Sequence, residues 1–258
     1  MTAVRITVLK RALHPELAAE SAAGVVKQCE VFKDGQEFIA GLTMPEGFCP
    51  WAWTDITRTM LALQAGGSFN RGLFSGWMKE GHTAVACCTD GFRPVSFKLE
   101  RIDTKSLIDV SRLTDPAPVD AYESERWGEF TYAFSGLKAG AGHRVRLHFC
   151  EVYHSGAGKR RFSVEAGGKP LLDDFDVFKE SGGAYRPIVR EFDVSADTKG
   201  GIVLAFKKGA ADQPKISAIE IRPSSGGKPI FAINAGGQAC GAFAADNHYT
   251  GGTAAPGS

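Results

Sequence analysis

This sequence has no excess of either charge, no long apolar run and few cysteines. Its 30 lysines and arginines face 29 aspartates and glutamates, so the formal net charge is +1. A balanced charge does not create the basic surface that attracts nucleic acids or anionic membranes. No apolar run approaches the roughly 20 residues of a membrane helix. We therefore expect neither a nucleic-acid partner nor a membrane partner.

Six cysteines in 258 residues are too few for a scaffold built on disulfides. The first ten residues alternate apolar and polar side chains, as a strand does, and lack the apolar core of a secretory signal. We therefore expect reduced thiols and a cytoplasmic location, or export if a signal has been trimmed. The length allows two domains, and we predict a boundary near residue 103.

Residues 1–103 are predicted to form a small α+β domain of unknown function. Alternation at residues 4–10 indicates a strand, and Pro15 suits the first position of a helix. A second helix begins at Pro50 and ends at Gly66, with apolar residues at helical spacing. Strands over 83–88 and 95–102 follow, joined by a turn that contains Asp90-Gly91.

Two motifs of this half carry a resemblance. They are Gly47-Phe48-Cys49 with the helix after it, and the segment 86–94, which reads Ala-Cys-Cys-Thr-Asp-Gly-Phe-Arg-Pro. With these motifs, residues 3–102 resemble a family of small uncharacterised prokaryotic proteins. That resemblance implies no known activity.

Four cysteines of this half are candidate zinc ligands, since thiolates can complete a tetrahedral site: Cys29, Cys49, Cys87 and Cys88. The spacing opposes zinc, because the sequence has no Cys-x-x-Cys pair and adjacent strand residues point to opposite faces. The alternative is that these cysteines are small apolar residues of the core. No catalytic constellation is evident, so an enzyme is not the favoured interpretation.

Residues 104–258 are predicted to form an all-β sandwich of the jelly-roll kind. Short stretches with alternating apolar residues recur between turn signals, and they lie near residues 130–134, 145–149, 162–164, 192–194, 202–206, 219–221 and 231–233. No long helix is readable between them.

The blocks of this half resemble the malectin-like carbohydrate-binding modules. They lie at 122–127, 145–153, 161–164, 174–178, 212–216 and 218–221, and the likeness covers about residues 108–258. One departure concerns order. Residues 232–252 are similar to the start of such a module but stand at its end. Either the domain is circularly permuted, with its opening strand at 228–258, or this block begins a second, truncated module. We favour permutation because the blocks together complete one module.

The resemblance implies a sugar-binding groove. Aromatic rings would cover the apolar face of a sugar while charged groups take its hydroxyls. The implied residues are Tyr122, Trp127, Tyr153, His154 and Tyr249, with Asp212 as hydroxyl acceptor and Arg126 and Asp246 as further candidates. The alternative is structural: Tyr122 and Trp127 belong to the core or a sheet edge, and Glu125–Arg126 is an ion pair.

Three classes of function follow. The favoured one is non-catalytic binding of an oligosaccharide or polysaccharide by the sandwich. The second is metal-binding, redox or enzymatic activity in the cysteine-bearing half, with the sandwich as a targeting module and zinc as the implied cofactor. The third is a protein-interaction scaffold that does not bind sugar. A glycosidase is disfavoured because no carboxylate pair stands out.

Overall fold

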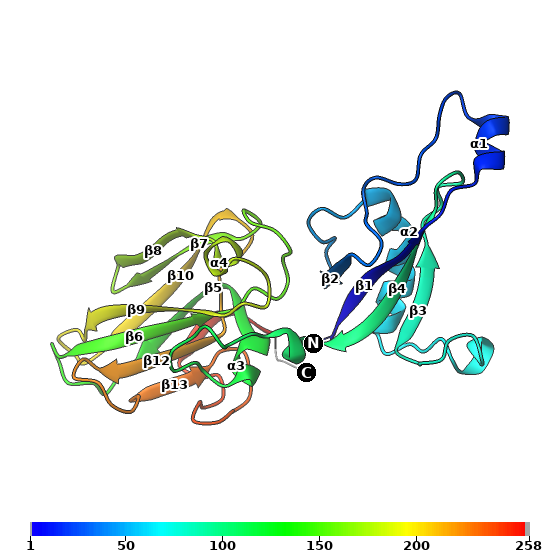
Figure 1. Ribbon diagram of the computed structural model, residues 1–258. Coiled ribbons are helices and arrows are strands. Elements are labelled where there is room, and N and C mark those ends of the chain that lie inside the picture. The colour runs from blue at the N-terminus through cyan, green and yellow to red at the C-terminus, as the bar shows by residue number, and fades with distance from the viewer. Residues whose placement is uncertain (1, 256–258) are drawn as a thin grey trace. The chain divides into compact units, whose positions relative to one another are not determined.

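The computed structural model describes residues 2–255, which divide into two compact units, Thr2–Asp103 and the chain from Thr104 onward. Most of the regular structure is β-sheet, with few helices (Figure 1). No helix among the described residues is long and apolar enough to cross a membrane.

The first unit is an antiparallel sheet of order β2-β1-β4-β3, with one long helix against it (Figure 1). Its elements are β1 (Thr2–Arg11), α1 (Pro15–Ser21), β2 (Glu37–Ala40), α2 (Pro50–Gln64), the 3-10 helix η1 (Gly72–Phe74), β3 (Thr83–Cys87) and β4 (Val95–Asp103). Alternate residues of β1 and β4 pack with Ile56, Met60 and Leu63 of α2 in one core. The predicted strands and helices are confirmed. Strand β2 escaped prediction because its four residues show too little alternation.

The second unit holds a six-stranded and a four-stranded sheet. Its elements are the 3-10 helix η2 (Thr104–Leu107), α3 (Val119–Glu123), β5 (Glu125–Phe134), β6 (Gly142–Phe149), β7 (Arg161–Ala166), β8 (Lys169–Phe175), α4 (Val177–Ser181), β9 (Ile188–Ser195), β10 (Ile202–Ala211), β11 (Lys215–Ile216), β12 (Ala218–Pro223), β13 (Phe231–Asn234) and β14 (Tyr249–Ala255). The first sheet follows β11-β5-β10-β7-β8, with β14 also on β5, and the second follows β13-β12-β6-β9.

Alternation along the strands builds the core between these two sheets. Phe130, Tyr132 and Phe134 of β5 face Val145, Leu147 and Phe149 of β6 within one buried cluster. Every stretch in which we predicted alternation lies in a strand, so period two was a sufficient signal here. Strands β8 and β14 were not predicted, because their polar and glycine residues hide the period.

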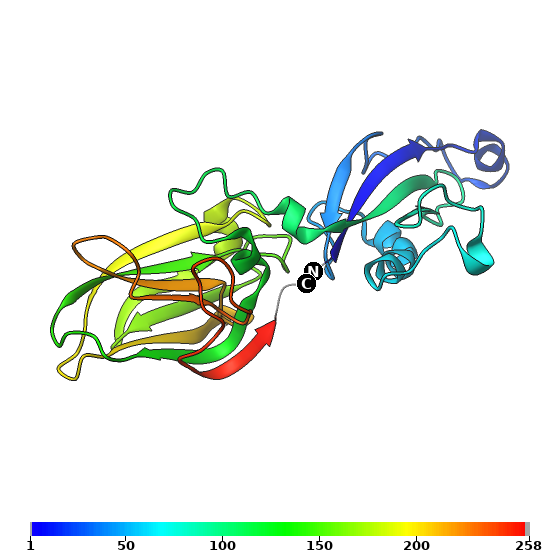
Figure 2. The same ribbon diagram turned by 90° about the horizontal axis from the view of Figure 1, so that it is seen from below.

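The C-terminal block completes this unit. Strand β13 pairs with β12, and β14 pairs with β5 along residues Glu125–Tyr132. Figure 2 shows β14, in red, lying beside β5 at the edge of the sheet. Between these strands, Gly236 has a φ of +73° and approaches β5 so closely that an added Cβ would lie 1.9 Å from the Glu125 carbonyl oxygen. Only glycine fits there, so the block is packed into the sandwich.

Candidate functional site

The loop after β6 presents an aromatic surface held by a buried carboxylate. Oε1 of Glu151, whose side chain is fully buried, accepts hydrogen bonds from the backbone N–H groups of Tyr153 and His154, both at 3.0 Å. The Tyr153 side chain is 43% exposed, and its ring meets the His154 ring edge-on at 4.9 Å. Two backbone bonds to one carboxylate therefore fix the backbone that carries the exposed Tyr153 ring and the partly buried His154 ring.

The polar partner of these rings is Asp212, which follows β10. Nε2 of His154 lies 2.7 Å from Oδ2 of Asp212, and Nη1 of Arg160 lies 3.2 Å from the same oxygen. Burial raises the pKa of Asp212, but the bond from His154 and the charge of Arg160 outweigh burial and lower it. Asp212 is therefore an ionised, partly exposed hydrogen-bond acceptor beside two aromatic rings.

Glu151 and Arg160 connect the two sides of this surface. Nε of Arg160 donates to Oε2 of Glu151 at 2.8 Å, and its Nη1 donates to the Gln213 carbonyl at 2.7 Å. Burial raises the pKa of Glu151, but the charges of Lys215 and Arg160, with the two N–H donors, lower it to about 2. The carboxylate therefore stays charged in the interior.

Trp127 lies on β5 next to the segment that carries Asp212. It is 39% exposed, and its register partner on β11 is Lys215, whose Nζ donates to the Cys150 carbonyl at 2.6 Å. The next residue, Gly128, donates its N–H to the Pro214 carbonyl at 3.1 Å. The structure thus links Trp127, through buried Lys215, to the loop that carries Tyr153.

Tyr249 lies on β14. Its register partner on β5 is Tyr132. One face of its ring is covered by Arg126, whose Cζ is 3.3 Å from the ring centroid. Its contact with Arg126 gives Tyr249 a structural role in holding β14 on β5.

Arg126 and Asp246 form a buried ion pair. Nε and Nη2 of Arg126 lie 2.9 and 2.6 Å from Oδ2 of Asp246, and the two side chains are only 3% and 8% exposed. Asp246 also accepts from the Tyr132 hydroxyl at 2.6 Å and from the Gly236 N–H at 2.7 Å. Both residues hold the C-terminal block on β5. The sequence suggested Glu125 as the ionic partner of Arg126, but Arg126 pairs with Asp246, and Glu125 pairs with Lys215.

Tyr122 is an interior residue. It lies in α3, is fully buried, and its hydroxyl contacts Nδ1 of His148 at 2.9 Å and accepts from the Ala117 N–H at 3.2 Å. Nε2 of His148 lies 2.8 Å from Oε1 of Glu220. In this structure Tyr122 does not form part of an exposed sugar platform. The reason is that segment 108–124 crosses the outer face of β6 and β12 and covers it.

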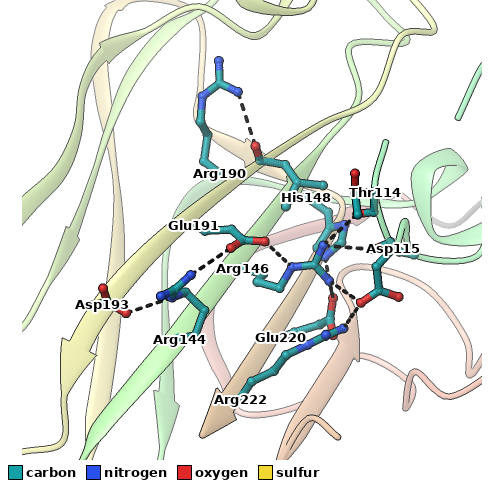
Figure 3. A network of polar contacts seen from close by, with 12 residues as sticks. Thr114, Asp115, Arg144, Arg146, His148, Arg190, Glu191, Asp193, Glu220 and Arg222 are labelled. Carbon is teal, nitrogen blue, oxygen red and sulfur yellow. Dashed lines mark hydrogen bonds and ion pairs between the residues drawn. The ribbon is translucent and has the colours of Figure 1, made fainter. Parts of the chain in front are cut away.

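Ion pairs hold that segment in place (Figure 3). Arg146 contacts Glu191, Glu220 and Asp115, and Arg222 contacts Asp115 and Glu220. Beside them lies a hollow of about 310 Å³, lined by Arg144, Arg146, Arg222 and neighbouring residues. Each of these arginines is paired with carboxylates, so the network is structural.

The candidate zinc ligands do not gather into a metal centre. Among residues 2–255, the group of three or more ligand atoms close enough to share an ion is Glu80, His82 and Glu100, and no cysteine belongs to it. Cys29, Cys49 and Cys88 pack against the core of their unit. Cys87 points to the exposed face. The packing agrees with the alternative of small apolar core residues for Cys29, Cys49 and Cys88, but not for the exposed Cys87.

Sequence reasoning missed three buried charges under the aromatic surface: Glu151, Arg160 and Lys215. A signal was present for one of them. Glu151 stands between Cys150 and Val152 at the end of the alternating stretch 145–149, where a charge is unexpected. Arg160 lies between Lys159 and Arg161 and Lys215 between Pro214 and Ile216, and only the tertiary structure shows that these two are buried.

Comparison with known proteins assigns a fold to this unit. The family model for the Malectin domain matches residues 98–219, just under half of the chain. The match begins within β4, ends within β12 and leaves out β13 and β14. The residues before 98 lie outside it, so the resemblance of that half to small prokaryotic proteins stays a prediction. No curated protein matches the chain.

Three solved structures illustrate the similarity. The ANX2 ectodomain from Arabidopsis thaliana is 18% identical, with a TM-score of 0.43 over 45% of this chain and 37% of that one. The structure of the plant peptide RALF23 in complex with FER and LLG2 is 23% identical, with a TM-score of 0.40 over 45% of this chain and 35% of that one. A β-glucuronidase from Bacteroides uniformis is 16% identical, with a TM-score of 0.35 over 42% of this chain and 12% of that one. The chain spans little more than a third of the plant proteins' length. Residues 98–219, which include most strands of the second unit, are similar to the Malectin domain.

Proposed function

We propose that the second unit is a non-catalytic carbohydrate-binding module whose binding surface is formed by Tyr153, His154, Asp212 and Trp127. The observation that carries this proposal is the ionised Asp212 carboxylate beside the exposed Tyr153 ring and the partly buried His154 ring. An aromatic ring covers the C–H face of a sugar, and a carboxylate accepts hydrogen bonds from its hydroxyls. The two requirements of sugar recognition therefore meet within one loop pair.

The charge of the surface favours a neutral sugar. Oδ2 of Asp212 is already engaged by His154 and Arg160, and the aspartate side chain is 35% exposed. An anionic sugar would meet this carboxylate, whereas a hydroxyl pair can donate to it. The ligand class is therefore an uncharged oligosaccharide or polysaccharide.

A glycan array on the full chain tests the function, with Tyr153→Ala alongside. Trp77→Ala is the matched control, because Trp77 is an exposed aromatic residue of the other unit. Binding to a defined set of neutral glycans, lost in Tyr153→Ala and kept in Trp77→Ala, supports the proposal. Absence of glycan binding by folded wild-type protein would contradict it, and screening of peptides would then follow.

We further propose that the malectin-like unit is circularly permuted, with residues 228–255 supplying its opening strands. The pairing of β13 and β14 within the two sheets supports this, as does the ion pair of Arg126 with Asp246. The test is a rearranged chain. Residues 228–255 are placed before residue 104 and joined to it by a flexible linker. We expect the rearranged protein to fold with unchanged glycan preference. Failure to fold with several linker lengths would contradict the proposal.

A further inference from the structure

We propose that Glu151 is the positioning residue of the surface formed by Tyr153, His154 and Asp212, an inference that rests on the proposed function. Its two carboxylate oxygens act on opposite sides of that surface. Oε1 accepts the backbone N–H groups of Tyr153 and His154, and Oε2 accepts Nε of Arg160. One buried side chain therefore joins two loops that lie some sixty residues apart in sequence.

The first arm of this role, the bonds from Oε1 to the Tyr153 and His154 N–H groups, is a direct contact. A carboxylate that accepts two N–H groups in sequence, two and three residues ahead of it, defines the turn that carries them. The turn sets the directions in which the Tyr153 and His154 rings leave the backbone. Because the acceptor is charged and shielded from water, each bond is stronger than an ordinary exposed one.

The second arm runs through Arg160. This guanidinium is 5% exposed and reaches both the Gln213 carbonyl and the Asp212 carboxylate. Asp212 itself has a φ of +53°, a conformation that side-chain-bearing residues rarely adopt. Contacts from Arg160 and His154 hold the residue there. Without Glu151, the buried cations Arg160 and Lys215 would keep Asp212 and Glu125 as partners but lose the carboxylate that acts on both.

The substitution Glu151→Gln tests both arms. The neutral amide oxygen accepts more weakly from the two N–H groups than the carboxylate does, and the amide nitrogen then faces the donors of Arg160. We expect amide hydrogen exchange at Tyr153 and His154 to rise roughly tenfold or more, with Val145 and Leu147 of β6 unchanged. The affinity for the bound glycan should fall by a similar factor. Glu191→Gln, which removes another carboxylate paired with arginines, is the control and should change neither quantity.

Arg160→Gln isolates the second arm and decides the matter if Glu151→Gln does not fold. We expect faster exchange at Asp212 and Gln213 and weaker glycan binding, with exchange at Tyr153 and His154 close to wild type. Unchanged exchange in folded Glu151→Gln, or an equal increase at all amides, overturns the positioning role. A wild-type protein that binds no glycan overturns the proposed function instead, and the exchange rates still report on Glu151.

Discussion

The guanidinium carbon of Arg126 lies 3.3 Å from the centroid of the Tyr249 ring. This stacked pair connects the start of β5 with the start of β14. Arg126 also bonds to Asp246 and to the Gly251 carbonyl, so one side chain holds three points of the C-terminal block. Two residues that resemblance assigned to sugar binding thus have a clear structural task.

Removal of the buried ion pair should loosen the C-terminal block. Arg126→Ala leaves the Asp246 carboxylate buried without its counter-charge, a change that costs about 3–5 kcal/mol in the free energy of unfolding. Chemical denaturation measures it. Arg161→Ala, which breaks the exposed pair with Asp174, should cost less than about 1 kcal/mol. Equal effects of the two substitutions would contradict the assignment.

Tyr122→Phe should lower stability and leave glycan binding intact. It removes the hydroxyl that accepts the Ala117 N–H and contacts Nδ1 of His148, so buried polar atoms lose their partner. The expected cost is about 1–3 kcal/mol in the free energy of unfolding. Denaturation and a glycan-binding assay check the two parts. Loss of glycan binding in a stably folded variant would contradict this assignment and show that Tyr122 contributes to binding.

Acid should weaken the second unit through His148. Burial lowers the pKa of His148 despite the opposing effect of Glu220. Between that folded pKa and the unfolded value near 6.5 the unfolded chain binds the extra proton, so stability falls as the pH drops through this window. Proton NMR of the His148 ring should show the neutral form at pH 6.5, with hydrogen on Nε2 donating to Glu220 and the Tyr122 hydroxyl donating to Nδ1. A protonated ring at pH 6.5 would contradict this.

Trp127→Ala should abolish or strongly weaken glycan binding without unfolding the protein. Its ring is partly exposed beside the segment that carries Asp212, and loss of one aromatic contact removes much of the apolar area that a sugar buries. We expect affinity to fall at least about tenfold, a loss of ~1.4 kcal/mol. Trp77→Ala serves as control. Wild-type affinity in Trp127→Ala would place the surface elsewhere.

The thiols should differ in reactivity. Cys87 is exposed, although burial of its sulfur and the neighbouring Cys88 raise its pKa. Cys150 is fully buried, and burial raises its pKa to about 12. Because the thiolate is the reactive form and needs access, a thiol reagent should label Cys87 first and Cys150 only after unfolding. Early labelling of Cys150 in native protein would contradict the structure.

The sequence by itself determined most of the strands and the long helix α2. Alternation of apolar residues marks the strands, because a β-strand points successive side chains to opposite faces. Proline and glycine mark the ends of α2 for equally local reasons. These signals depend on residues within a few positions of each other, so they can be found without knowing the fold.

Only the tertiary structure decided which predicted site residues are exposed. Tyr122 and Trp127 stand five positions apart in one motif, yet Tyr122 is covered by its own segment and Trp127 lies at the surface. The stacking of Tyr249 on Arg126 depends on the register of β14 on β5, and the role of Glu151 depends on its contacts with Arg160 and Lys215. Register and burial arise from contacts between distant segments, and no local pattern encodes them.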